Sequence, residues 1–110
     1  MKLTSRKQTA LNDTCKLIQT VYMPDKIGNE IPKEEQFEVF CGLFSITQAE
    51  HYKAAQIGLR ADLGAVISTI DDNGAGQAQV NGKRYKVYRR YIRGDGYTEL
   101  YLQETQNDSD

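Results

Sequence analysis

The stretch from residue 81 to residue 104, NGKRYKVYRRYIRGDGYTELYLQE, places the strongest constraint on the fold of this chain. Asn81-Gly82 supplies the two positive-φ residues that a two-residue hairpin turn requires, and Gly94-Asp95-Gly96 interrupts the chain again. Aromatic and β-branched residues fill the segments between and after these turns, and such residues suit a half-buried pleated surface. We therefore predict an antiparallel hairpin with strands at 83–92 and 97–103.

Side chains alternate between the two faces of a strand, so the first of these strands divides into two sets. One face would carry Tyr85, Val87, Arg89 and Tyr91, and the other Arg84, Lys86, Tyr88, Arg90 and Ile92. In the second strand, Leu100 and Leu102 oppose Tyr97, Glu99 and Tyr101. The pattern predicts one apolar face for the hairpin.

The remainder of the chain reads as short strands separated by turn signals. We predict further strands at 14–23, 36–46, 62–70 and 77–80, loops at 25–32 and 71–76, and one helix at 47–58. Closure into a barrel would remove vulnerable sheet edges, and Gly42 suggests a bulge or sharp bend. The predicted fold class is mainly β: a small curled antiparallel sheet or β-barrel of about six strands with one short α-helix.

The helix prediction rests on its two ends. Thr47 and Glu50 form a capping-box pattern, and Gly58 fits the position just past the last turn. Ala49, Tyr52, Ala55 and Leu59 fall on one side, so we expect the helix to lie as a lid on the sheet. The residues predicted to be buried are Phe37, Val39, Leu43, Tyr52, Ile67, Val87, Leu100 and Leu102.

A chain of 110 residues is long enough for one modest core, so we expect one domain at 14–104. A flexible N-terminal arm at 1–13 and a flexible acidic tail at 105–110 would flank it. The net charge of −1 gives no bulk attraction to polyanions, although six of the 14 lysines and arginines lie between residues 83 and 93. No apolar run approaches the ~20 residues of a membrane helix, so we expect a soluble cytosolic product without membrane contact.

We find no residue pattern typical of catalysis, a metal site or a cofactor site. His51 has no second ligand at suitable spacing, so we expect a surface histidine and not a zinc site. Cys15 and Cys41 lie on separate predicted strands, where buried free thiols are favoured over a disulfide. Residues 71–74 resemble half of a calcium loop but lack its final glutamate, which indicates a turn. We therefore expect a protein that is not an enzyme.

The basic and aromatic residues of the 83–93 segment allow three interpretations. Cations interleaved with stackable rings are typical of barrels that bind single-stranded nucleic acid. Alternatively, the arginines pair with Glu99 or Glu104 on the neighbouring strand and form a solvated face. The third interpretation is a DNA-channel or subunit contact that reads no sequence. The candidate contact residues are Arg84, Lys86, Tyr88, Arg89, Arg90 and Arg93.

The order of three segments carries a family resemblance. The helix QAEHYKAAQIGL, the strand GAVISTI, and NGKRYKVYRR turning into TELYL resemble the head-tail joining (head-completion or stopper) proteins of long-tailed bacteriophages, over residues 14–104. The matching positions are Glu50, Tyr52, Ala54 and Ala55 on the helix, and Gly82, Lys83, Tyr85 and Val87 on the hairpin. A longer N-terminal arm and the more basic run at 89–93 depart from the pattern and leave the position within the phage neck open.

The resemblance implies a small β-barrel subunit of the virion neck, made in the bacterial cytoplasm and assembled into a homo-oligomeric ring. Such a ring extends the channel of the portal, contacts the portal or an adaptor protein, helps to retain packaged DNA and offers a docking surface to the tail-end protein. No catalytic residue is implied. Under this interpretation we expect two polar loops to project as assembly contacts or a channel gate. Their candidate residues are Asp25, Lys26 and Asn29 in one loop and Asp71, Asp72 and Asn73 in the other.

Overall fold

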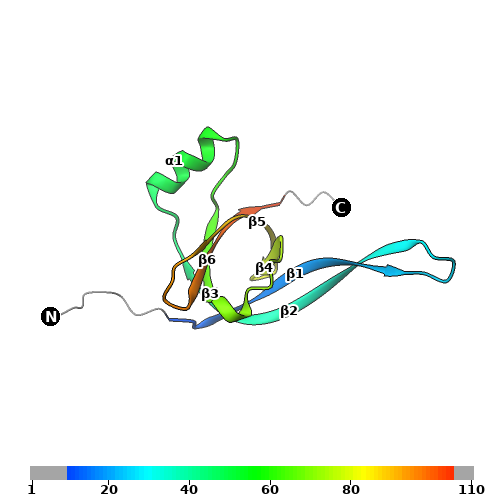
Figure 1. Ribbon diagram of the computed structural model, residues 1–110. Helices are drawn as coiled ribbons and strands as arrows, with labels where there is room; N and C mark the ends of the chain where they lie inside the picture. The colour runs from blue at the N-terminus through cyan, green and yellow to red at the C-terminus, as the bar shows by residue number, and fades with distance from the viewer. Residues whose placement is uncertain (1–9, 106–110) are drawn as a thin grey trace.

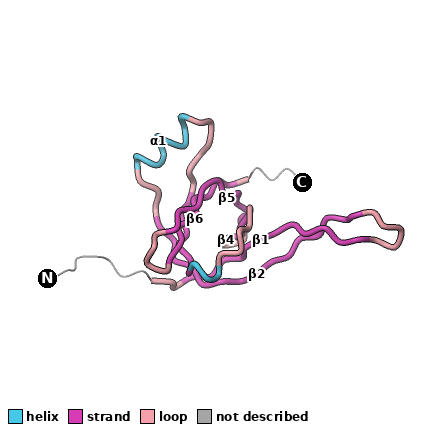
Figure 2. The backbone as a smooth tube through the Cα atoms, viewed as in Figure 1, coloured by secondary structure: helices cyan, strands magenta, loops and turns pink. Residues whose placement is uncertain are grey.

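The structure is a computed structural model that describes residues 10–105, and over this range the chain forms a closed six-stranded antiparallel barrel with one short helix. The elements are β1 (Asp13–Pro24), β2 (Glu30–Phe44), α1 (Gln48–Gln56), β3 (Leu63–Ser68), the 3₁₀ turn η1 (Thr69–Asp71), β4 (Gln77–Val80), β5 (Lys83–Ile92) and β6 (Tyr97–Glu104). Around the barrel the strand order is β1-β2-β3-β6-β5-β4 (Figures 1 and 2). The predicted fold class is confirmed. The expected flexible ends fall largely outside the described residues.

The predicted turn between β4 and β5 is confirmed. Asn81 and Gly82 both have positive φ, at 51° and 80°, as a two-residue hairpin turn of the primed type requires. The turn brings β4 alongside β5, and β4 then closes the barrel by pairing with β1 over Lys16–Ile18. Only three residues of β1 take part in that seam, because β4 is just four residues long.

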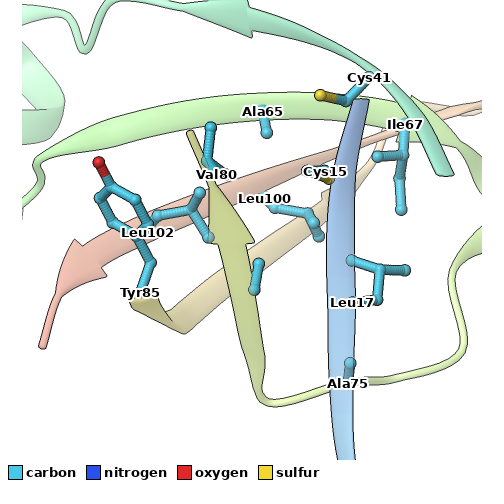
Figure 3. Close-up of a cluster of buried hydrophobic side chains, with 11 residues drawn as sticks. Cys15, Leu17, Cys41, Ala65, Ile67, Ala75, Val80, Tyr85, Leu100 and Leu102 are labelled. Atoms are coloured by element: carbon cyan, nitrogen blue, oxygen red, sulfur yellow. The ribbon is translucent and has the colours of Figure 1, made fainter. Parts of the chain in front are cut away.

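The core fills the inside of the barrel (Figure 3). Ile67, Leu100 and Leu102 are fully buried as predicted, together with Leu17 and Val80. Val39, Leu43 and Val87 are half-buried and pack against this cluster. Small residues complete the core and allow a barrel of only six strands to close tightly; they are Cys15, Cys41, Ala65, Ala75 and Ala78.

Two predicted core residues are exposed. Phe37 keeps 42% of its surface exposed and Tyr52 keeps 67%. Phe37 lies opposite Leu17 where the β1–β2 hairpin leaves the barrel, so no other layer of the described chain covers it fully. Tyr52 is exposed because α1 does not lie on the sheet: only Glu50 and Ala54 of the helix are buried, and the predicted packing stripe is not. The expected lid is therefore wrong.

The N-terminus of α1 follows the sequence prediction closely. The helix is shorter than expected, but Thr47 caps it, and its hydroxyl accepts a hydrogen bond from the Glu50 N–H at 3.1 Å. In a full capping box, Glu50 would reach back to the Thr47 N–H. Here its carboxylate turns to β5 instead and joins the helix to the barrel.

Gly42 does not mark a bulge. It pairs with Val66 in an uninterrupted register between β2 and β3. A side chain at this position would collide with the backbone carbonyl of Ala10, so glycine allows the chain before β1 to pass close over the strand. The predicted bulge was wrong, because a strand position that another backbone segment approaches closely also requires glycine.

A β-bulge lies in β5 between Val87 and Arg89. Because one extra residue reverses the alternation of a strand, the predicted division of β5 into two faces holds only before the bulge. Beyond it, Arg90 lies opposite the buried Leu100, whereas Arg89 lies opposite Tyr101 on the outer side. The bulge therefore separates basic side chains that a regular strand would place in one row.

The β1–β2 hairpin extends well beyond the barrel. We call residues 19–35 the arm: they follow Ile18, the last β1 residue paired with β4, and precede its β2 partner Gln36. The arm projects as an isolated two-stranded ribbon (Figure 1). It helps to explain a radius of gyration of 16.2 Å, against about 13 Å for a compact domain of 100 residues.

Candidate functional site

The basic residues of β5 other than Lys86 are held in separate ion pairs. Arg84, before the bulge, crosses to the base of the arm, where its Nη1 lies 2.9 Å from the carboxylate of Glu34 and 2.8 Å from the side-chain oxygen of Gln77. The guanidinium thus connects three strands on the outside of the barrel. This contact braces the arm and leaves Arg84 only partly available to another ligand.

Arg89, just after the bulge, holds the helix. Its Nη2 donates to the Glu50 carboxylate at 2.7 Å, and the Tyr88 hydroxyl donates to the same carboxylate at 2.8 Å. The guanidinium carbon of Arg89 also lies 4.0 Å from the ring centroid of Tyr101. Burial raises the pKa of Glu50, but the hydrogen bonds from Arg89 and Tyr88 outweigh it, so the net shift is downward. Glu50 is therefore an ionised anchor, and its ionised state stabilises the docked helix.

The two neighbouring tyrosines stay protonated. Burial and hydrogen bonding to Glu50 raise the pKa of Tyr88 well above its ordinary value. Burial, and donation of the Tyr101 hydroxyl to Glu99 at 2.6 Å, raise the pKa of Tyr101 to about 12. Both rings therefore act as neutral hydrogen-bond donors and packing surfaces, and neither is set up as a base.

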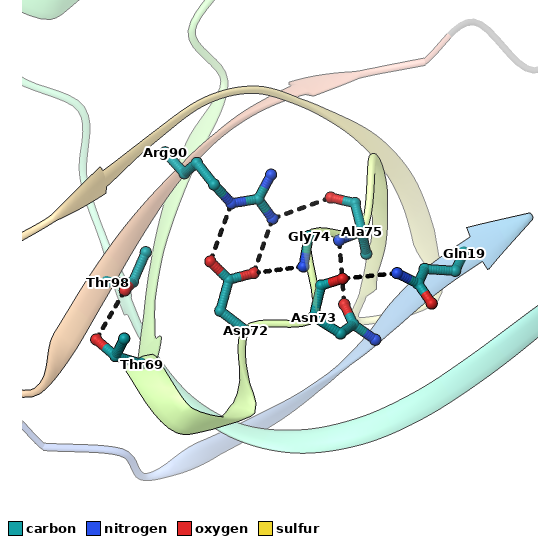
Figure 4. Close-up of polar contacts among 8 residues, drawn as sticks. All are labelled: Gln19, Thr69, Asp72, Asn73, Gly74, Ala75, Arg90 and Thr98. Carbon is teal, nitrogen blue, oxygen red and sulfur yellow. Dashed lines mark hydrogen bonds and ion pairs between the residues drawn. The ribbon is translucent and has the colours of Figure 1, made fainter.

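Arg90 closes one end of the barrel (Figure 4). Its guanidinium donates twice to the carboxylate of Asp72, at 3.0 Å each, and once to the carbonyl of Ala75 at 3.0 Å. Gln19 adds a 2.6 Å hydrogen bond to the carbonyl of Asn73. The loop 71–76 is consequently folded against the barrel end with Ala75 in the core, and it does not project as the sequence suggested. The reason is a tertiary ion pair that no local pattern reveals.

The first and last basic residues of the 83–93 segment, Lys83 and Arg93, also lie near acids. Arg93 contacts Asp95 at 2.8 Å and approaches Glu99 at 3.9 Å, and Lys83 approaches Glu104 at 3.9 Å. Within residues 10–105, Lys86 alone among the six candidate contact residues carries a charge with no opposite partner within 4.0 Å. This arrangement favours the ion-paired interpretation of β5, although most partners differ from the glutamates expected.

The arm carries the other predicted loop at its tip. Asp25 accepts hydrogen bonds from the Ile27 N–H at 2.9 Å and the Asn29 N–H at 2.8 Å, and Gly28 takes a φ of 92°. These bonds shape a tight turn of residues 25–29, so Asp25 is turned inward and Lys26 and Asn29 are exposed beside the apolar Ile27. Unlike the loop 71–76, this loop projects from the barrel as expected.

Sequence reasoning missed the exposed apolar residues of the arm. Directly opposed residues share a face, so Val21, Met23 and Ile31 continue the inward-facing row of Leu17 beyond the barrel. Met23 and Ile31 oppose each other and keep 48% and 49% of their surfaces exposed. Pro32 and the charged residues at 33–35 are not typical of a buried strand, so this part of β2 was not predicted as a strand. An exposed edge strand, however, tolerates proline. The arm therefore carries apolar side chains that the described chain leaves partly exposed.

No group of three or more side chains that could together hold a metal ion occurs among the residues that the structure describes, and His51 is exposed on α1. Cys15 and Cys41 are free and buried, as predicted, and hydrogen bonding to Cys41 together with burial raises the pKa of Cys15. An open polar groove of ≈ 590 Å³ is lined by Gln77, Gln79, Gly82, Lys83, Arg84, Glu104 and Thr105.

Comparisons with known proteins leave the family of this chain open. No protein-family model matches the sequence, and no curated protein matches it significantly. Within the described range, no helix has the length and apolar character needed to cross a membrane.

Proposed function

We propose that this chain is a structural subunit of the neck of a tailed bacteriophage, one of several identical copies in a ring between portal and tail. The observation that carries the proposal is the arm, a projecting ribbon with exposed apolar residues fixed to a rigid barrel. Exposed apolar surface of this kind marks a contact site, and a ring subunit needs a surface that its neighbours cover.

The stabilising contacts of the barrel support the same role. Ion pairs between distant segments brace the base of the arm through Arg84, the helix through Arg89 and the barrel end through Arg90. A subunit that transmits load between a head and a tail benefits from such bracing. The helix, strand and hairpin order that resembles head-tail joining proteins agrees with this role, and it implies the portal or an adaptor and the tail-end protein as partners.

Contact with packaged DNA would be non-specific in this proposal. The paired arginines of β5 present little free positive charge, and Lys86 is the one candidate residue that remains available. Binding of single-stranded nucleic acid through Tyr88 and Arg90 would require breaking the contacts to Glu50 and Asp72. For that reason we propose a ring subunit, and we treat binding of single-stranded nucleic acid as one possible outcome of the test.

The test is co-expression with the portal protein encoded in the same genome, followed by purification of the portal ring and measurement of its mass. The proposal predicts that the portal ring, alone or with its adaptor, retains several copies of this chain. A control chain with residues 22–32 replaced by Asn-Gly should fold and fail to join. Failure of the intact chain to join any portal or adaptor ring contradicts the proposal, and tight, salt-sensitive oligonucleotide binding in its place would favour the strand-binding function.

A further inference from the structure

The arm and the helix α1 leave the barrel on opposite sides (Figure 1). Each carries apolar side chains that the described chain leaves uncovered: Met23 and Ile31 on the arm, Tyr52 and Ile57 at α1. Ile57, the residue that ends the helix, is 71% exposed. Two uncovered surfaces at opposite ends of one subunit suit a head-to-tail contact, in which each copy uses both.

The charges of the two surfaces are complementary. The arm contains the acids Asp25, Glu30, Glu34 and Glu35 and the bases Lys26 and Lys33, a net charge of −2 that becomes −1 when the pairing of Glu34 with Arg84 is counted. On α1, Glu50 is already neutralised by Arg89, so the exposed Lys53 dominates the helix surface. An arm that meets a second arm would bring like charges together, whereas an arm that meets α1 would bring opposite charges together.

The attachment of α1 also suits it for docking. The helix stands off the barrel and is fixed by the Glu50 contacts to Tyr88 and Arg89 at its first turn. This leaves Tyr52, Lys53 and Ile57 exposed on a helix whose position is nevertheless defined. A helix that served only its own barrel would bury its apolar side chains against the sheet.

We propose that the arm of one copy of this chain packs against α1 of the next copy, with Met23 and Ile31 against Tyr52 and with Lys53 facing the acidic arm. The inference rests on the proposed ring and names the two surfaces that build it. Repetition of this heterologous contact closes a ring when the rotation between neighbours closes.

Cysteine cross-linking tests the contact directly. Variants Ile31→Cys and Tyr52→Cys are mixed at millimolar concentration and mildly oxidised, with native Cys15 and Cys41 protected by burial. The inference predicts cross-linked dimers in the mixture, none with either variant alone, and a ladder of multimers when one chain carries both substitutions. Ile70→Cys, an exposed position at the barrel end, is the control partner and should not cross-link to Ile31→Cys.

Charge reversal provides the second measurement. Lys53→Glu should weaken self-association about fivefold, whereas Lys86→Glu, the same change on β5, should leave it unchanged. Cross-linking of Ile31→Cys to itself or to Ile70→Cys, or no cross-linking in any mixture, overturns the inference. If the chain still joins the portal ring in that case, the proposed function survives without this contact. If the ladder forms but no portal ring retains the chain, the contact survives and the proposed function fails.

Discussion

The carboxylate of Glu50 on α1 accepts hydrogen bonds from both Arg89 and Tyr88 on β5, at 2.7 and 2.8 Å, and these bonds join the helix to the barrel. The same residue forms part of the helix cap, since its N–H donates to Thr47. One glutamate therefore both helps to start the helix and positions it. The position of the surface that we propose as a docking site depends on this residue.

Glu50→Gln should destabilise the fold. The substitution removes the charge from a buried acceptor while Arg89 remains, and hydrogen bonds to charged groups contribute about 1.5–3 kcal/mol. We expect a loss of about 1–2 kcal/mol in the free energy of unfolding, measured by urea denaturation. Glu35→Gln, on the exposed arm, is the matched control and should change it by less than about 0.5 kcal/mol. Equal effects of the two substitutions would contradict the anchoring role of Glu50.

The contribution of Glu50 should depend on pH with a definite sign. Its pKa is lowered in the folded state from an ordinary value of 4.5, so the folded state favours the ionised form. The stabilisation is therefore fully present above the ordinary pKa and is lost as pH falls through the lowered folded pKa. The stability difference between the native chain and Glu50→Gln should be constant from neutral pH down to mildly acidic pH and shrink below pH 4.5. A difference that grows as pH falls would contradict this assignment.

The core and the base of the arm should respond differently to truncation. Leu100 is fully buried, so Leu100→Ala should cost about 2–5 kcal/mol. Phe37 is larger, but it loses less surface from water in the described fold, and Phe37→Ala should cost less than Leu100→Ala does. Thermal unfolding of the two purified variants makes the comparison. A larger loss for Phe37→Ala would mean that Phe37 is covered in the isolated chain, contrary to the described fold.

Changes in the two predicted loops should affect folding differently: the projecting loop should be dispensable for folding, and the loop 71–76 should not. Replacement of residues 22–32 by Asn-Gly keeps a two-residue turn after the pair Val21 and Lys33 and should leave the barrel about as stable as before. Asp72→Ala should instead cost about 1–3 kcal/mol, because Arg90 loses its bidentate partner. Circular dichroism on heating measures both. Loss of the cooperative unfolding transition in the chain with the shortened arm would mean that the arm is needed for folding. An unchanged transition in Asp72→Ala would mean that the pairing of Asp72 with Arg90 does not stabilise the barrel.

Local signals predicted those parts of the fold that local chemistry determines. Asn81-Gly82 forms the turn that its φ values require, Thr47 caps the helix, and the alternation of Leu100 and Leu102 identifies a buried face. Such features depend on neighbours in sequence. They sufficed for the fold class and for part of the core, namely Ile67, Leu100, Leu102 and the two buried cysteines.

The features that the sequence did not predict depend mainly on contacts between residues distant in the chain. The bulge after Val87 reverses the faces of β5, and nothing in the alternation of that segment marks it. The pairing of Arg90 with Asp72 turns an apparently projecting loop into the closure of the barrel end. The arm was hidden because exposed edge strands need not follow a buried-strand pattern: Pro32 lies opposite Tyr22 in a regular register.

Averaged electron-microscopy images of the portal ring purified with this chain would show whether the chain forms part of that ring. We expect a closed ring of small barrels coaxial with the portal channel, in which each arm reaches the neighbouring barrel. Images in which the portal ring carries no such layer, or in which this chain lies off the axis as a single copy, would contradict it.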